Sequence, residues 1–125
     1  MLNAPDPWKP LVLVVENEPI LRMSAVDMVR GAGFPVVEAV DVADAVRLLE
    51  SRPDIRIVFS DIDMPHGADG ASLSTAIRRR QPLVEVILTS GRLDPGADAL
   101  PVRSVFLPKP YKPEDVLAVM RHMAG

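Results

Sequence analysis

Residues 55–65 read IRIVFSDIDMP, and this stretch decides the fold. Its first part is mainly apolar and β-branched, a pattern typical of a strand buried on both faces of a parallel sheet. The strand ends at Asp61, and a loop that contains Pro65 follows. Because ligands bind at the carboxyl edge of open α/β sheets, we expect Asp61 to lie at a functional edge.

The composition is that of one ordinary globular domain. The 125 residues are 48% hydrophobic and 25% charged, and a net charge of -3 gives no reason to expect direct binding of nucleic acid. The run Arg78-Arg79-Arg80 is expected to end a helix, where cations complement the helix dipole. The chain has no cysteine, which excludes disulfides and thiol catalysis and is typical of a reducing cytosol. With no visible signal peptide or membrane-spanning stretch, we expect a cytoplasmic protein with no membrane contact.

The order of elements predicts a doubly wound α/β domain. Residues 1–10 hold three prolines and are predicted to form an N-terminal tail before a domain at residues 11–125. Apolar runs predict five strands, at residues 11–15, 35–39, 55–61, 84–90 and 104–107. Amphipathic segments alternate with them, and the helix starts are predicted from Pro19, from Asp41 as an N-cap and from Pro113. This alternation implies a parallel sheet covered by helices on both faces. The fourth helix is predicted to be shortened, because residues 93–101 contain two prolines and a glycine.

Polar side chains follow the predicted strands at the points where these strands end. They are Glu16, Asn17, Asp61, Asp63, Ser90 and Lys109. Because the carboxyl ends of parallel strands share one edge, these residues are expected to converge there. Clustered carboxylates need a compensating cation, and Mg²⁺ takes oxygen ligands from carboxylates, water and phosphate. A lysine and a hydroxyl beside such a metal suit a phosphoryl group, which points to Asp61 as a nucleophile that forms an aspartyl phosphate.

These motifs resemble the receiver domain of two-component response regulators. The resemblance spans almost the whole chain and rests on four segments: Val14–Pro19, Asp61–Pro65, Ser90–Gly91 and Phe106–Pro110. It implies a flavodoxin-like (βα)5 fold and a single-domain response regulator rather than an enzyme. It also implies phosphorylation by a sensor histidine kinase or a histidine phosphotransfer protein, with Mg²⁺, in a phosphorelay whose output is contact with another protein.

The resemblance assigns a phosphoacceptor and a switch. Asp61 corresponds to the phosphoacceptor, and Lys109 to the lysine that contacts the phosphate. Phe106 corresponds to the switch aromatic residue. The switch hydroxyl is either Thr89 or Ser90, and Ser90 is chosen because the small residue that the family places next is then a glycine. The family's Lys-Pro peptide bond is cis, so the bond that follows Lys109 is predicted to be cis as well.

The resemblance also assigns a metal site, and one departure from the family falls within that site. Glu16, Asn17 and Asp61 would hold Mg²⁺ together with the backbone carbonyl of Asp63. Asn17 stands where the family usually has an aspartate, and a neutral amide oxygen is a weaker ligand.

Two alternatives stay open beside the receiver hypothesis. A degenerate receiver would act as a binding module that needs no phosphorylation, which the asparagine at position 17 favours. A haloacid-dehalogenase-like phosphatase would use Asp61 and Asp63 as an Asp-x-Asp pair, although the chain is short for the usual cap. His66 has no neighbouring histidine or cysteine at metal-ligand spacing and is expected to lie in a surface loop.

Overall fold

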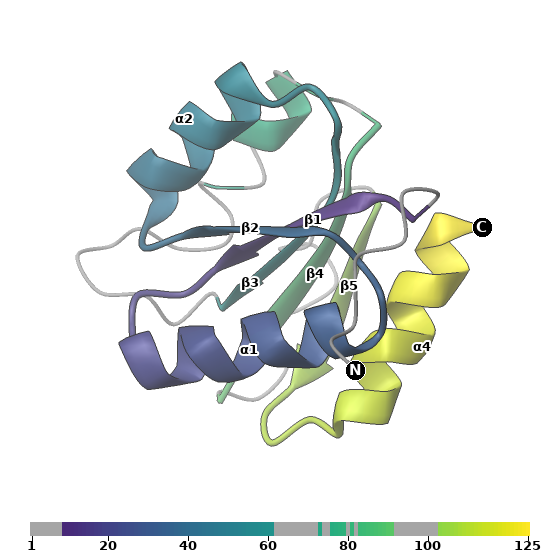
Figure 1. Ribbon diagram of the computed structural model, residues 1–125. Helices are drawn as coiled ribbons and strands as arrows, with labels where there is room; N and C mark the ends of the chain where they lie inside the picture. Colours follow the sequence, from purple (N-terminus) through teal and green to yellow (C-terminus); the bar gives the residue numbers. More distant parts are fainter. Residues whose placement is uncertain (1–8, 62–72, 74–75, 80, 82, 92–102) are drawn as a thin grey trace.

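Five parallel strands form one sheet in the order β2-β1-β3-β4-β5 (Figure 1). The structure is a computed structural model and describes residues 9–61, 73, 76–79, 81, 83–91 and 103–125. The strands are β1 (Leu11–Val15), β2 (Val36–Ala39), β3 (Ile55–Asp61), β4 (Glu85–Ser90) and β5 (Ser104–Pro108). The predicted five-stranded parallel sheet is confirmed.

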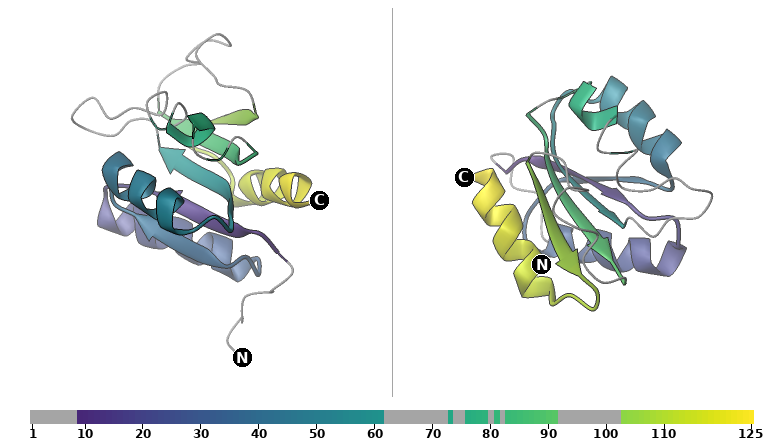
Figure 2. Two further views of the ribbon diagram at one scale, coloured as in Figure 1. Left: turned by 90° about the horizontal axis from the view of Figure 1, so that it is seen from above. Right: turned by 180° about the vertical axis from the view of Figure 1, so that it is seen from behind.

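Helices cover both faces of this sheet, as the predicted doubly wound fold requires. They are α1 (Pro19–Gly31), α2 (Val42–Ser51) and α4 (Pro113–Ala124), and residues 73 and 76–79 are also helical. α2 lies on one side of the sheet, and α1 and α4 lie on the other (Figures 1 and 2). The predicted short fourth helix falls on residues 93–101, which lie outside the described residues.

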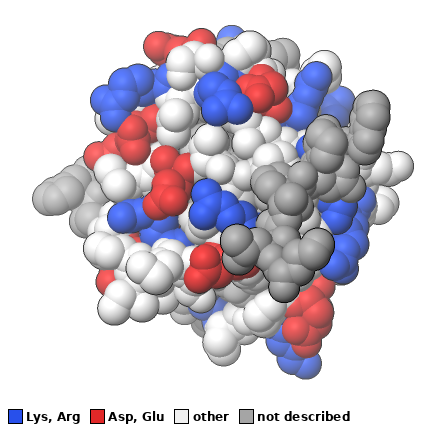
Figure 3. All heavy atoms as spheres, viewed as in Figure 1, with Lys and Arg blue, Asp and Glu red and all other residues white. Residues whose placement is uncertain are grey.

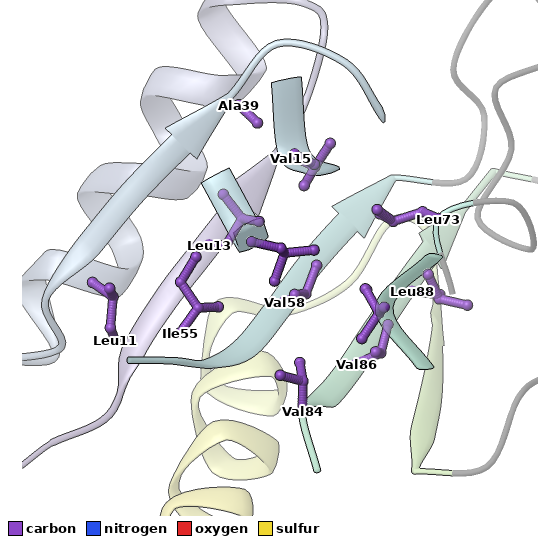
Figure 4. Close-up of a cluster of buried hydrophobic side chains, with 13 residues drawn as sticks. Leu11, Leu13, Val15, Ala39, Ile55, Val58, Leu73, Val84, Val86 and Leu88 are labelled. Atoms are coloured by element: carbon purple, nitrogen blue, oxygen red, sulfur yellow. The ribbon is translucent and has the colours of Figure 1, made fainter. Parts of the chain in front are cut away.

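Each face of the sheet carries its own hydrophobic core. In β1, Leu11, Leu13 and Val15 belong to the core under α2, which Figure 4 shows. The intervening residues Val12 and Val14 belong to the core under α1 and α4. Successive side chains of a strand point to opposite faces, so a strand buried on both sides has to be apolar throughout. The two cores fix the strands, and with them the positions of the strand ends.

The helices begin where local signals predict. α1 starts with Pro19 in its first turn, and the Glu18 carboxylate caps it by accepting from the backbone N–H of Leu21 at 2.8 Å. α2 is capped by Asp41, whose Oδ1 accepts from the N–H of Asp44 at 2.7 Å. α4 starts at Pro113. The Glu18 carboxylate therefore caps the N-terminal end of α1 and contacts the helix rather than the polar cluster at the strand ends.

The surface carries charges of both signs. On the face shown in Figure 3, lysine and arginine side chains are interspersed with aspartate and glutamate. Within the part of the chain that the structure describes, no helix is long and apolar enough to cross a membrane.

Candidate functional site

Buried polar side chains gather at one edge of the sheet. Among the described residues, the buried polar or charged ones are Glu16, Ser60, Asp61, Thr89 and Ser90. All of them lie at or just beyond the carboxyl ends of β1, β3 and β4. Burial of polar groups is unfavourable unless they are paired or serve a function, so this edge is the candidate site.

Lys109 and Asp61 form the central contact of this edge. The lysine Nζ lies 2.6 Å from Asp61 Oδ2, although the two residues are 48 positions apart in the chain. The Asp61 side chain is only 8% exposed and the lysine side chain 28%. The backbone N–H of Lys109 donates to the carbonyl oxygen of Ser90 at 2.8 Å, and the Lys109–Pro110 peptide bond is cis, as predicted. A short charge-assisted hydrogen bond of this kind holds the lysine at the carboxylate.

Glu16 adds a second carboxylate beside Asp61. Burial raises the pKa of the Glu16 carboxyl, the backbone N–H of Glu18 lowers it, and the neighbouring Asp61 carboxylate raises it further. That N–H donates to Glu16 Oε2 at 3.0 Å. Lys109 also lowers the pKa of Glu16. The Lys109 ammonium group thus lies beside two adjoining carboxylates.

This donor set fits a hard divalent cation. Mg²⁺ is commonly bound by one or two carboxylates and keeps several waters or phosphate oxygens as further ligands. Within the described residues, no group of three or more aspartate, glutamate, histidine or cysteine side chains could hold a metal ion. Glu16 and Asp61 would supply a pair of charged ligands, with the other positions left to water, carbonyl or phosphate oxygen.

Of the two other predicted metal ligands, the structure describes Asn17 but not Asp63. Asn17 is exposed, directly after the buried Glu16. Asp63 and His66 fall outside the described residues, so the expectations for both stay predictions.

A cavity of about 400 Å³ opens at the same edge. Its polar lining is Glu16, Asp61, Thr89 and Lys109. The rest of its lining is mainly apolar and comes from β1, α1, β3 and the segment after β5: Val14, Val15, Leu21, Ala25, Phe59, Pro110 and Tyr111. Apolar walls with a few convergent polar groups are typical of small-molecule and phosphoryl-group sites.

Strand register separates the two candidate switch hydroxyls. Thr89 is the residue of β4 that pairs with Asp61, whereas Ser90 pairs with Pro108 of β5. Paired residues of parallel strands point to the same face and successive residues point to opposite faces. Thr89 accordingly lines the cavity, and Ser90 is not among the lining residues. Thr89 thus shares the cavity face with Asp61, and the choice of Ser90 as the switch hydroxyl stays a prediction. Phe106 is half-buried and packs against the core on the other face of the sheet.

Tyr111 is a site residue that sequence reasoning missed. It lines the cavity, and its ring meets that of Phe59 edge to face, with the ring centroids 5.7 Å apart and an interplanar angle of 74°. Burial raises the pKa of the Tyr111 hydroxyl. An aromatic residue two positions after Lys109, at the same edge of the sheet, was the available signal.

Comparison with known proteins places the chain in one family. The family model for the response regulator receiver domain matches residues 12–121. The chain is 33% identical over 116 residues to the sensor kinase CckA of Brucella abortus (strain 2308), which covers 90% of this chain and 12% of the kinase. It is 35% identical over 118 residues to the response regulator protein FleR of Pseudomonas aeruginosa, covering 91% of this chain and 24% of FleR. It is also 35% identical over 116 residues to the transcriptional regulatory protein PdtaR of Mycobacterium tuberculosis, covering 85% and 52%. The chain thus spans between 12% and 52% of the length of these relatives.

Solved structures share the fold. The receiver domain of the hybrid histidine kinase CckA is 28% identical, with a TM-score of 0.79 over 92% of this chain and 99% of that chain. A response regulator receiver protein from Sinorhizobium medicae WSM419 is 23% identical, with a TM-score of 0.85 over 93% and 94%. The receiver domain of a sensor histidine kinase from Pseudomonas aeruginosa PAO1 is 24% identical, with a TM-score of 0.80 over 94% and 98%, and has a magnesium ion coordinated in its active-site cleft.

Proposed function

Because this chain belongs to the response regulator receiver domain family, a family of signalling modules, we propose that it is a phosphorylation-controlled switch with Asp61 as its phosphoacceptor. The observation that carries the proposal is the buried contact of Lys109 with Asp61 beside Glu16. The phosphoryl donor is a phosphohistidine of a sensor histidine kinase or of a histidine phosphotransfer protein.

The residues of the edge suit this transfer. The Asp61 carboxylate forms a bond to phosphorus while the bond from phosphorus to the donor's imidazole nitrogen breaks, and the imidazole takes up a proton. Lys109 offsets the negative charge on the phosphoryl oxygens, and the Thr89 hydroxyl donates a hydrogen bond to one of them. We propose Thr89 for the phosphate contact for this reason, while the predicted switch pair, Ser90 and Phe106, lies on the opposite face of the sheet.

The proposal includes a bound Mg²⁺. Glu16 and Asp61 would hold it, with Asn17 and the backbone carbonyl of Asp63 as the predicted further ligands. When bound, the ion supplies neutralisation of the charge that builds up on the transferred group. The repulsion between the two adjoining carboxylates and the magnesium-containing receiver structure support this part of the proposal.

Other parts of the proposal rest on the sequence. The division into a tail at residues 1–10 and a domain at residues 11–125 stays a prediction. So do a cytoplasmic location and an output through contact with a protein target rather than with nucleic acid or a membrane.

Labelling with a small phosphodonor tests the phosphoacceptor. Incubation with phosphoramidate and Mg²⁺ is expected to add one phosphoryl group, detected by intact-protein mass spectrometry. Asp61→Asn is expected to abolish the addition. Asp54→Asn is the matched control, because Asp54 is an exposed aspartate at the opposite edge of the sheet. Undiminished labelling of the Asp61 variant would overturn the assignment.

A binding module that needs no phosphorylation is the second candidate. It is favoured by the exposed, neutral Asn17 at the predicted metal site. An inert wild type together with an Asn17→Asp variant that is labelled would support this candidate. Labelling of the wild type would exclude it. The match to the receiver family leaves the phosphatase alternative without support.

A further inference from the structure

Arg22 of α1 reaches the candidate site from outside the cavity. Its Nη1 donates to the backbone carbonyl oxygen of Glu16 at 3.0 Å, and its Nε donates to Glu38 Oε1 of β2 at 3.1 Å. The Arg22 side chain is only 17% exposed. One guanidinium therefore joins α1, the end of β1 and β2.

Hydrogen bonds at the backbone and at the side chain hold Glu16 in place. Its backbone N–H donates to the carbonyl oxygen of Ala39 at 3.1 Å, so one side of the residue is tied to β2. Its carbonyl oxygen is held by Arg22, and its carboxylate by the N–H of Glu18. The position of Glu16 is thus fixed from three elements at the point where β1 ends and α1 has not yet begun.

The geometry of the guanidinium explains why an arginine suits this place. Its N–H groups form a planar fork with fixed directions, so the contact with Glu38 sets the direction of the contact with Glu16. The Glu38 side chain is 48% exposed, and such a pair contributes little to stability. The main effect of the contact with Glu38 is therefore to orient the Arg22 guanidinium.

We propose that Arg22 is a positioning residue for the metal site: it holds Glu16 so that its carboxylate meets the cation, and Glu38 orients the guanidinium. This inference rests on the proposed function, in which Glu16 is a ligand of Mg²⁺. A residue that hydrogen-bonds to a metal ligand without touching the metal affects metal affinity strongly, typically by 10- to 100-fold.

Mg²⁺ binding by the full chain tests the proposal. Dissociation constants are measured from amide chemical shifts in a titration with Mg²⁺. Arg22→Gln is expected to weaken binding about tenfold. Arg22→Lys can still donate to the Glu16 carbonyl and is expected to lose only about threefold. Arg47→Gln removes another paired helix arginine, the partner of Asp44, and is expected to leave binding unchanged. An Arg22→Gln affinity within twofold of the wild type would overturn the proposal.

Stability with and without Mg²⁺ separates positioning from a merely structural role. A structural role would lower the stability of Arg22→Gln equally in both conditions. The proposed role predicts that the variant also gains less stability from added Mg²⁺, because the gain follows the affinity. An equal gain in variant and wild type would overturn the proposal.

Two further results keep the test decisive. If Arg22→Gln does not fold, Glu38→Gln replaces it: about threefold weaker Mg²⁺ binding supports the proposal, and unchanged binding overturns it. Failure of the proposed function would give a different result from failure of this inference, because Asp61 of the wild type would then not be labelled. Normal labelling of the wild type with unchanged Mg²⁺ affinity in Arg22→Gln would reject the positioning role alone.

Discussion

The two edges of the sheet carry the same kinds of charged residue in opposite settings. At the carboxyl edge, Lys109 pairs with Asp61, whose side chain is 8% exposed. At the amino edge, Arg103 pairs with Glu85 at 3.2 Å, and these side chains are 44% and 28% exposed. Solvent reaches both partners of the second pair, whereas in the first pair it reaches Lys109, at 28% exposure, but hardly the Asp61 carboxylate.

The difference separates a surface pair from a functional one. The amino-edge pair has one charge of each sign, and the Arg78 guanidinium lies close enough to interact with both of them. The carboxyl edge keeps Glu16 as an extra buried carboxylate with a raised pKa. An arrangement that leaves like charges close together is not the most stable one, and such departures mark sites that serve a ligand.

Removing the cation from the carboxyl edge is expected to have the largest effect on stability. Lys109→Met retains the apolar stem and leaves Asp61 and Glu16 without their ammonium partner. Breaking a buried pair lowers stability by 3–5 kcal/mol, and the partial exposure of this lysine reduces the expected loss to about 2 kcal/mol at pH 7. Urea denaturation without Mg²⁺ measures it. A loss no larger than that of a surface arginine would contradict the proposed contrast between the edges.

Much of the scaffold that positions this edge could be predicted from local sequence. The apolar run of β1 and the caps of α1 and α2 depend on neighbouring residues, and the predicted strand at residues 11–15 has the bounds of β1. β5 extends to Pro108, one residue beyond the prediction. A proline is compatible with an edge strand because one side of that strand forms no ladder hydrogen bonds.

The finer geometry of the site depends on contacts between distant residues. The choice between Thr89 and Ser90 requires the register of β4 against β3, which no local pattern contains. Arg22 looks like an ordinary helix arginine until Glu38, 16 positions later, is found beside it. The sequence therefore predicted where the polar residues of the edge lie, but not which of two adjacent side chains lines the cavity with Asp61.

The two hydroxyls of β4 test that choice directly. Thr89→Ala is expected to slow labelling of Asp61 by phosphoramidate about tenfold, because the cavity loses a hydrogen-bond donor to the phosphoryl group. Ser90→Ala is expected to react at a rate close to that of the wild type, since Ser90 points to the other face of the sheet. Thr89→Ser should restore most of the rate. A larger loss in Ser90→Ala would assign the phosphate contact to Ser90 instead.

Neutralising the extra carboxylate is expected to stabilise the metal-free protein. Burial raises the pKa of Glu16 above its ordinary 4.5, so the folded state favours the protonated form. The contribution of Glu16 to stability is therefore greatest below pH 4.5 and falls as pH rises through the raised pKa. Glu16→Gln removes this loss, keeps an oxygen for the N–H of Glu18, and should gain about 1 kcal/mol at pH 7.

Thermal unfolding at several pH values measures the effect. The gain should vanish at acidic pH, where the wild-type carboxyl is also neutral, and saturating Mg²⁺ should favour the wild type. A Glu16→Gln variant that is less stable than the metal-free wild type at pH 7 would show that the carboxylate is well compensated by its neighbours.

The smallest effect is expected at the amino edge, and it sets the baseline for the comparison. Arg103→Gln breaks the pair with Glu85 and should lower stability by only about 0.5 kcal/mol at low ionic strength, because both charges remain solvated. Arg103 has a positive φ of 64°, and glutamine is chosen because it leaves this backbone preference nearly unchanged. The difference should disappear in about 1 M salt, where screening acts over roughly 3 Å. Urea denaturation at low and high salt measures this difference in stability. A loss of stability that remains at high salt would mean that the pair at the amino edge is as well protected from solvent as the pair of Lys109 and Asp61.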